Sequence, residues 1–446
     1  MVLIKRILNV ALILLLLNAV ILEKIFKPSM LICVVTAVLL VIYFIKYNII
    51  PVKRTVGTYK LIIMIGGYEI IVSASVIFAL ELLVYLLILM PHRIETIPTV
   101  SLVVNFLVFV VGFLILLWNG LLRIITTSSQ VGVSLKVILF FTWWIPIWNV
   151  IIIWKCCHIV HREYTFEISK IELNNQRKES EICKTKYPIL LVHGIFWRDW
   201  QVFNYWGRIP RELIKNGATI YYGKQQSATS MDICANEIKE QILHIMEKEH
   251  CDKVNIIGHS KGGLDARYAI SCLGIEQHIA SLTSIGTPHK GCRFVDRILE
   301  KLPKKFVLAV AKRYNAMYVK LGDKTPDFYS GIYDLTTNKC AEFNEKVPNK
   351  EGVLYQSVAS KMSSFFSAGF PLNIGYAFIK PKEGENDGFV TVESSKHGNF
   401  LGCYSTKRNR GVSHGDTIDL MRKNINEFDV CESYVDIVKG LKAKGL

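Results

Sequence analysis

The sequence has no C-x-x-C pair, no arginine-rich block and no repeat of alternating basic and aromatic residues. Its 11 cysteines are scattered, a pattern that suits a reducing compartment as well as a disulfide-bonded one, so they leave the compartment open. The net charge of +16 is spread over single lysines and arginines. This distribution argues against nucleic acid as a partner and favours affinity for an anionic membrane surface.

Charge is also scarce in long stretches of the first third of the chain. With 446 residues, 51% of them hydrophobic, and a mean hydropathy of +0.31, the chain is too apolar to be one soluble globule. Almost all of the apolar excess precedes residue 156, in runs near the ~20 residues that cross a bilayer core. The first run lacks a small-x-small cleavage site, so we interpret it as an uncleaved anchor. We predict five spans, at 7–22, 30–50, 69–90, 98–119 and 136–154.

The flanking basic residues predict an orientation for these spans. With five spans, eight lysines and arginines lie on the side of the N-terminus and five on the other side. This bias favours a cytoplasmic N-terminus, a multi-pass protein of the cell membrane and an extracytoplasmic C-terminal domain. The eight are Lys5, Arg6, Lys46, Lys53, Arg54, Lys60, Arg123 and Lys136, and the five are Lys24, Lys27, Arg93, Lys155 and Arg162.

The composition divides the chain into three parts. Residues 1–158 form the predicted all-α membrane domain, residues 159–186 a polar juxtamembrane connector with one short strand at 164–171, and residues 187–446 a compact domain. In the compact domain, short apolar runs alternate with amphipathic ones. Alternation of this kind predicts a mostly parallel sheet with helices on both faces.

The stretch DKVNIIGHSKGG, residues 252–263, carries the strongest chemical signal. An apolar strand leads into Gly258-His259-Ser260-Lys261-Gly262, and a helical pattern follows, which is the context of a G-x-S-x-G nucleophile elbow. The glycines allow a sharp strand-to-helix turn that lifts the Ser260 hydroxyl clear of the sheet. The alternative is a glycine-rich turn that carries an incidental serine.

A serine nucleophile needs a base, an acid that orients the base, and donors for the oxyanion. In this fold the expected chain order is Ser, then Asp or Glu, then His, which selects Asp387 in NDGFV and His414 in SHGD as the best candidates. A helical pattern is expected after His414, through residue 421. The oxyanion donors are expected to be the amides of Lys261 and Ile195, the latter in His193-Gly194-Ile195-Phe196. The competing histidines are His259, His278, His289 and His397.

Six blocks from 187 to 425 resemble, in the same order, those of the bacterial triacylglycerol lipases of the Pseudomonas and Burkholderia type. They are ILLVHGIF, IIGHSKGGLDARY, SLTSIGTPHKG, YDLTTNKCAEFN, NDGFVTVESS and SHGD. The resemblance implies an α/β-hydrolase fold C-terminal to the transmembrane domain. It also implies Ser260 as nucleophile, Asp387 as triad acid, His414 as base, and the amides of Ile195 and Lys261 as oxyanion hole.

Two features depart from that family or extend it. Relatives hold a structural calcium with two aspartates, and Asp416 matches one of them, but no aspartate lies between Ser360 and Asn386 to match the other. The chemistry requires no cofactor, and calcium is expected at most as a structural ion.

Residues 294–321 mix a wide apolar face with many cations. They are predicted to be a lid that docks on the bilayer, or else an ordinary cap helix.

These observations predict a membrane-anchored serine hydrolase that cleaves carboxylic esters of lipids. The partners expected are an acyl-ester substrate and the lipid bilayer, and the sequence names no protein partner. One alternative keeps the triad but acts on phospholipids or lipoproteins, or transfers the acyl group to an alcohol. Another alternative, from a different class, is a membrane protein that binds lipid without turnover.

Overall fold

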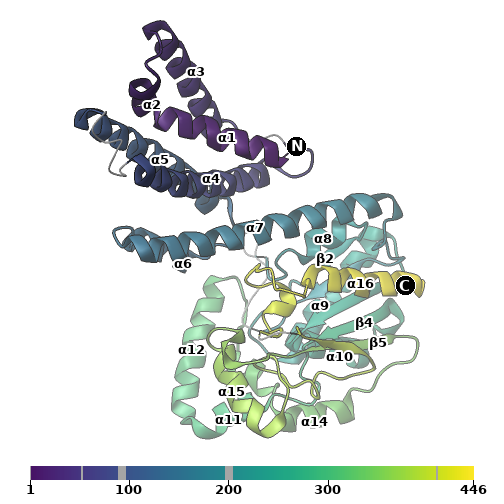
Figure 1. Ribbon diagram of the computed structural model, residues 1–446. Helices are drawn as coiled ribbons and strands as arrows, with labels where there is room; N and C mark the ends of the chain where they lie inside the picture. The colour runs from purple at the N-terminus through teal and green to yellow at the C-terminus, as the bar shows by residue number, and fades with distance from the viewer. Residues whose placement is uncertain (1, 52–53, 89–96, 196–203, 408–409) are drawn as a thin grey trace. The chain divides into compact units, whose positions relative to one another are not determined.

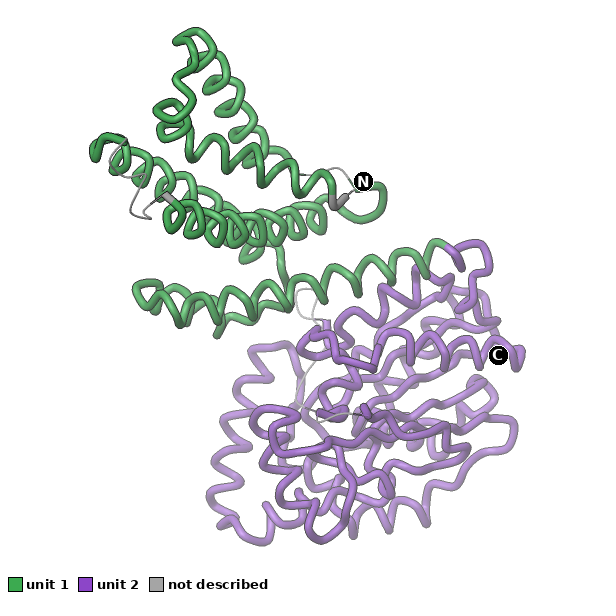
Figure 2. Tube along the Cα trace, in the orientation of Figure 1, with its two compact units in different colours: residues 1–175 green, residues 176–446 purple. Residues whose placement is uncertain are grey.

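The structure is a computed structural model that describes residues 2–51, 54–88, 97–195, 204–407 and 410–446. It divides into two compact units, residues 1–175 and 176–446 (Figure 2). The second unit therefore begins inside the stretch that the sequence assigned to a connector.

Helices form the described part of the first unit (Figure 1). Within the described residues, three of them are long and apolar enough to cross a membrane, or four if the pair α1 and α2, bent by 73°, forms one span. The elements are α1 (Val2–Leu17), α2 (Ala19–Phe26), α3 (Met30–Ile49), α4 (Tyr59–Ile88), α5 (Thr99–Thr127), α6 (Val133–Phe141) and α7 (Pro146–Arg177).

Two of the sequence predictions for this unit are wrong. The run 136–154, expected to be a fifth span, is divided between α6 and α7 by a turn that ends at Pro146, a residue suited to a first helical turn. The strand expected at 164–171 is part of α7. Its apolar residues recur every three to four positions and pack on the helical core, so tertiary packing selects a helix there.

Glycines and a polar cluster fix the packing of α4 and α5. A Cβ on Gly67 would lie 2.9 Å from the carbonyl oxygen of Gly120, so the two helices approach closely at small residues. Glu81 is buried in the bundle, where its carboxylate accepts a hydrogen bond of 2.6 Å from Asn18 at the bend between α1 and α2. Asn105 of α5 in turn donates to Asn18. Asn18 thus joins polar groups of α4 and α5 inside an apolar bundle, while the second oxygen of Glu81 is buried without a hydrogen-bond partner among the described residues.

The second unit contains a six-stranded parallel sheet in the order β2-β1-β3-β4-β5-β6. Its edge strand β2 has only three residues, whereas β3 and β4 are buried along their whole length. The strands are β1 (Ile189–Val192), β2 (Ile220–Tyr222), β3 (Val254–His259), β4 (Ile279–Ile285), β5 (Leu354–Ser360) and β6 (Asn399–Tyr404).

Helices cover both faces of this sheet, as the alternating pattern predicted. Side chains at odd positions of β1 pack with α8 (Ile209–Lys215) and α16 (Val430–Ala443), while those at even positions pack with α9 (Met231–Glu249) and α10 (Lys261–Cys272). This alternation follows from the two-residue period of a strand. The sheet order and the two helical layers are those of an α/β-hydrolase domain.

Five further helices complete the described part of the unit. The segment predicted as a lid forms α11 (Arg293–Lys301) and α12 (Lys304–Lys320), followed by α13 (Phe328–Tyr333), α14 (Thr337–Lys346) and α15 (Leu372–Glu383). The helix expected through residue 421 is wrong: only the 3-10 turn Asp416–Ile418 forms. Asp419 takes a left-handed φ of 55° and accepts hydrogen bonds from the Arg208 guanidinium, a contact that ends the turn.

Candidate active site

The turn at Ser260 has the geometry of a nucleophile elbow. Ser260 lies between buried strand β3 and helix α10, with φ 53° and ψ −129°, a conformation that L-residues avoid. Holding a non-glycine residue there costs about 1–3 kcal/mol, and such strain persists where the surrounding fold enforces it. The amide of Ser260 donates to the carbonyl of Ile285 (3.0 Å), which ties the elbow to the end of β4.

The glycines of the motif are required by contact distances. A Cβ on Gly258 would lie 2.9 Å from the Cα of Gly263, and one on Gly262 would lie 2.6 Å from the carbonyl oxygen of Val192. Side-chain atoms do not fit at such separations. The first turn of α10 therefore packs directly on the end of β1, the strand that leads into the predicted oxyanion loop.

Asp387 and His414 form a buried pair. His414 Nδ1 lies 2.8 Å from Asp387 Oδ2, and the His414 amide donates to the carbonyl of Asp387 (2.9 Å). Asp387 is fully buried and also accepts hydrogen bonds from the amides of Phe389 and Val390 and from the Ser360 hydroxyl. Because an ionised carboxylate only accepts, His414 carries its proton on Nδ1 and leaves Nε2 as a base.

The fold brings this pair to the elbow. The ring of His414 lies 4.5 Å, between centroids, from the ring of His259, which immediately precedes Ser260. Gly286, at the end of β4, faces the same place, because a Cβ there would lie 3.2 Å from His414 Nδ1 and 3.4 Å from Asp387 Oδ2. Asp387 and His414 therefore lie at the edge of the sheet where β3 leads into the elbow.

The predicted oxyanion loop is connected to His414 by a buried chain of hydrogen bonds. The Gly194 amide donates to the Tyr205 hydroxyl (3.0 Å), which lies 2.7 Å from His259 Nδ1. Thr417 Oγ1 lies 3.0 Å from His259 Nε2 and donates to the carbonyl of His414 (2.7 Å). Since a carbonyl cannot donate, Thr417 uses its hydrogen there, so His259 donates from Nε2 and accepts from Tyr205 at Nδ1. His259 is therefore neutral, and burial together with His414 lowers its pKa well below the usual value.

Sequence reasoning did not select Tyr205, Thr417 or Ser360. Tyr205 lies 55 positions before Ser260 in the chain, and Thr417 lies 157 positions after it. Neither residue is part of a motif that the sequence analysis used. Only the tertiary fold places them beside the elbow. A buried polar side chain among apolar neighbours is a weak sequence signal without that arrangement.

Ile195 and Lys261 occupy the positions expected of the oxyanion donors. Ile195 follows the end of β1 and Lys261 begins α10, and within its described residues the structure records no acceptor for either amide. Amides left free at a helix start are suited to a developing negative charge. Phe196, the last residue of the predicted loop, lies outside the described residues.

The Lys261 side chain has a separate role. It is 2% exposed, points into the domain, and pairs with Asp265 one turn later at 2.6 Å. This i, i+4 spacing favours ion pairs on a helix, and a buried pair of this kind is costly to break one partner at a time. The pair joins the first two turns of α10, the helix that follows the elbow.

The competing histidines have other partners. His259 belongs to the chain described above, and His289 uses both ring nitrogens, with Arg267 and with Ser284. His397 bonds Asn349 through Nε2 (2.8 Å), and His278 contacts the carbonyl of Asp252 near the surface. Their contacts leave His414 as the histidine beside Asp387 and the elbow.

The residues around Asp416 do not fit a calcium cage. Asp416 accepts hydrogen bonds from the Ser413 amide and hydroxyl, and its other oxygen lies 2.9 Å from the Arg410 guanidinium. A guanidinium thus holds the charge that a hard cation would neutralise, and a single carboxylate supplies too few oxygen ligands. Within the described parts of the chain, no group of three or more His, Cys, Asp or Glu side chains is arranged to hold a metal ion.

A parallel sheet covered on both faces, with a strained serine between a strand and a helix, defines an α/β hydrolase of the lipase and esterase type. Comparisons with known proteins refine this class. A family model described as palmitoyl protein thioesterase matches residues 188–357. A triacylglycerol lipase of Vibrio cholerae is 30% identical over 293 residues, which cover 59% of this chain and 90% of the relative.

On this basis the chain belongs to the triacylglycerol lipase family. A triacylglycerol lipase of Burkholderia plantarii is 31% identical over 178 residues, 37% of this chain, and the match spans about half, 49%, of that relative. The crystal structure of Staphylococcus hyicus lipase gives a TM-score of 0.44 at 18% identity and covers 58% of this chain and 98% of that one. The two lipase relatives match 37% and 59% of this chain.

Proposed function

We propose that the protein is a membrane-anchored serine hydrolase that cleaves the carboxylic ester bonds of lipids through a Ser260-His414-Asp387 triad and an acyl-enzyme. The observation that carries the proposal is the 2.8 Å contact between His414 Nδ1 and Asp387 Oδ2, made beside a serine in left-handed backbone conformation. Orienting acid, base and nucleophile are the three parts that acyl transfer requires.

In this mechanism His414 Nε2 takes the proton of the Ser260 hydroxyl as its oxygen attacks the ester carbonyl. The amides of Ile195 and Lys261 donate to the oxyanion of the tetrahedral intermediate. His414 then gives the proton to the leaving alcohol, and water repeats both steps to release the fatty acid. Asp387 holds the imidazole in the required tautomer and stabilises its charged form.

The apolar helices support membrane anchoring, and the charges that flank the five spans predicted from the sequence support an extracytoplasmic catalytic domain. A catalytic domain held beside the bilayer meets its lipid substrate at a raised effective concentration without any new contact.

We infer that the helices α11 and α12 cover the site as a lid. Phe306, Leu308 and Val319 leave apolar area exposed on α12, in company with many lysines.

The test is hydrolysis of a short-chain and a long-chain nitrophenyl ester by the detergent-solubilised full chain. Ser260→Ala is expected to lose at least about 10³-fold in kcat, as removal of a triad nucleophile does, and to lose covalent labelling by a fluorophosphonate. Ser271→Ala, a substitution farther along the same helix, is the control and should keep both. Lipid binding without turnover or labelling in the wild type would support a non-catalytic lipid-binding protein instead.

A second reaction is favoured by the match to palmitoyl protein thioesterase over residues 188–357. The same triad would then remove acyl groups from thioester-linked or ester-linked acylated proteins, or from phospholipids, or transfer them to another alcohol. The ratio of kcat/KM for a palmitoyl-cysteine peptide to that for a triacylglycerol separates these reactions. A ratio well above one would make the protein a deacylase of proteins.

A further inference from the structure

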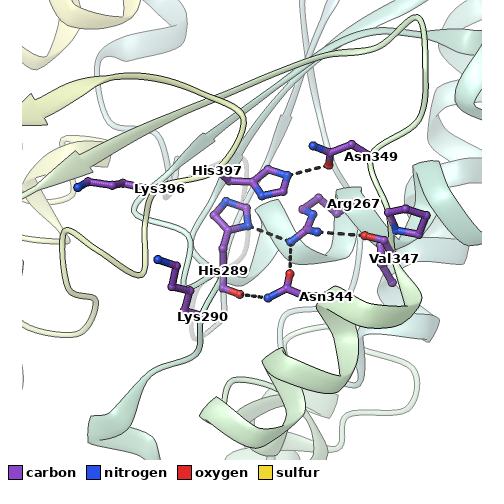
Figure 3. A pocket seen from close by; sticks show the side chains of 9 residues that line it. Arg267, His289, Lys290, Asn344, Val347, Asn349, Lys396 and His397 are labelled. Carbon is purple, nitrogen blue, oxygen red and sulfur yellow. Dashed lines mark hydrogen bonds between the residues drawn. The ribbon is translucent and has the colours of Figure 1, made fainter.

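A pocket lies in the hydrolase unit, apart from the elbow (Figure 3). Its volume is about 340 Å³. This volume is near the lower end of the range, roughly 300–1,000 Å³, that small-molecule sites occupy. Its walls come from α10, the loop after β4, the end of α14 and the loop before β6. The polar residues that carry its chemistry are Arg267, His289, Lys290, Asn349, Lys396 and His397.

Arg267 is a buried cation whose partners are all neutral. Its side chain belongs to a residue only 3% exposed, and its guanidinium donates to His289 Nδ1 (3.2 Å), Asn344 Oδ1 (2.8 Å) and the carbonyl oxygen of Val347 (3.1 Å). Its Nε is buried without a hydrogen-bond partner among the described residues. A buried charge without a counter-ion costs several kcal/mol, so an anion from solution would complete this site.

The two imidazoles form a flat wall beside Arg267. The rings of His289 and His397 stack with centroids 4.4 Å apart and an angle of 20°, as Figure 3 shows. His289 accepts from Arg267 and so donates from Nε2 to Ser284 (2.9 Å), and His397 donates from Nε2 to Asn349. Burial lowers the pKa of both rings, with Arg267 contributing, so both are neutral near pH 7.

Two lysines add positive charge at the border of the pocket. Lys290 follows His289 in the loop after β4, and Lys396 precedes His397 in the loop before β6. Lys396 is paired with Glu393 at 2.8 Å, whereas Lys290 has no ion pair among the described residues. The lining residues thus include three cations and no carboxylate. A buried guanidinium with ammonium groups at its border is typical of phosphate recognition, although Glu393, outside the lining, neutralises part of the lysine charge.

We propose that this pocket binds a phosphate group, either free or carried by a phosphorylated glycerol headgroup, with Arg267 at its base and Lys290 and Lys396 at its border. The site is distinct from the elbow and does not rest on the proposed function. The loop that carries His289 and Lys290 begins at Gly286, which faces His414. A ligand in the pocket would therefore touch a segment that also borders the catalytic pair.

The experiment is calorimetric titration of the detergent-solubilised full chain at constant ionic strength with inorganic phosphate and, separately, with glycerol 1-phosphate. We expect saturable binding that the double variant Lys290→Gln, Lys396→Gln weakens about tenfold or more, because two charge-assisted contacts are removed. Lys439→Gln, a substitution of an exposed lysine on α16, is the matched control and should bind as the wild type does.

The variants change only surface lysines, so folding is expected to be preserved, and Arg267→Gln serves as a second test if it folds. Glycerol 1-phosphate binding at least tenfold tighter than inorganic phosphate would identify the headgroup as the source of the phosphate. Equal affinities would identify free phosphate. The proposal is overturned if neither ligand binds, or if the double variant binds both as tightly as the wild type does.

Discussion

At the scale of single residues, the site combines one strained residue with several that only hold position. Ser260 is held in an unfavourable φ of 53° at the elbow, and His414 is fixed by Asp387 through its ring and its backbone. Tyr205 and His259 contact neither substrate nor nucleophile hydroxyl in the proposed mechanism. With Thr417 they connect the Gly194 amide to the carbonyl of His414, and so link the predicted oxyanion loop to the predicted base.

Tyr205→Phe tests this positioning role. The change removes the hydroxyl that accepts from Gly194 and donates to His259, so the loop before Ile195 should shift slightly. Removing a whole oxyanion donor costs 10²–10³ in kcat, so we expect a smaller loss of about tenfold, with KM nearly unchanged. Steady-state kinetics on a soluble nitrophenyl ester measure both.

The matched control is Tyr376→Phe. Tyr376 is also buried, and its hydroxyl donates to the carbonyl of Ser363 (3.1 Å), away from the oxyanion loop. Tyr205→Phe loses the hydrogen bonds to Gly194 and His259, whereas Tyr376→Phe loses the one to Ser363, so the free energy of unfolding of both variants is measured beside their kinetics. Equal kcat values for the two variants would argue against a positioning role for Tyr205.

His397 makes stability depend on pH in a defined direction. Burial, with Arg267, lowers the pKa of His397 from 6.5 to about 4. Between these values the unfolded chain binds the proton more tightly, so stability is full above about pH 6.5 and falls as the pH drops toward 4. Melting temperatures of the solubilised protein at pH 7.5 and 4.5 should differ less in His397→Gln than in the wild type. An unchanged difference would place the acid sensitivity elsewhere, for example at His259 or His289, whose pKa values burial also lowers.

At the scale of elements, the chemistry depends on where strands end. The predicted oxyanion loop follows β1, the elbow follows β3, Gly286 follows β4 and Ser360 ends β5. In a parallel sheet all these ends lie at one edge, so four separate segments supply one site. The helix α12 is different, because Phe306, Leu308 and Val319 remain exposed on it.

If α11 and α12 form a lid, loss of apolar side chains on α12 should lower activity on emulsified esters selectively. Phe306 and Val319 are 55% and 57% exposed on α12, and burying two such side chains in lipid is worth about 1.5–3 kcal/mol each. Phe306→Ser with Val319→Ser should lower hydrolysis of an emulsified long-chain ester about tenfold or more and leave a monomeric short-chain ester unchanged. Leu243→Ser, on an equally apolar and 43% exposed position of α9, is the control. If both esters are hydrolysed in the wild-type ratio, α12 is an ordinary cap helix.

At the scale of the whole molecule, an apolar helical unit precedes a catalytic one, and the number of spans decides which side of the membrane carries the catalysis. An odd number puts the N-terminus and the hydrolase unit on opposite sides, and an even number puts them on the same side. The described residues contain three such helices, or four if α1 and α2 cross together. The bend at Asn18, where Glu81 and Asn105 converge, therefore bears directly on topology.

We expect a tag placed after Leu446 to be labelled by a membrane-impermeant reagent on intact cells. The expectation follows from the five-span count of the sequence, in which lysine and arginine are in excess on the side of the N-terminus. Four spans, as when α1 and α2 cross together, would leave the C-terminal tag on the same side as the N-terminus. A second tag before residue 2 is the control and should be labelled only after permeabilisation. Protection of the C-terminal tag would place the hydrolase unit in the cytoplasm.

The sequence by itself determined the apolar first third, the alternation of strands and helices, and the elbow. These are local signals: hydrophobic period, chain order and the glycines that close contacts demand, such as Gly258 and Gly262. It also selected Asp387 and His414, which the structure pairs at 2.8 Å. The tertiary structure alone decided that 164–171 is helical, that 136–154 is interrupted, and that Asp416 pairs with Arg410. It alone brought Tyr205, Thr417 and the pocket around Arg267 together, because contacts between distant segments depend on packing that no local pattern encodes.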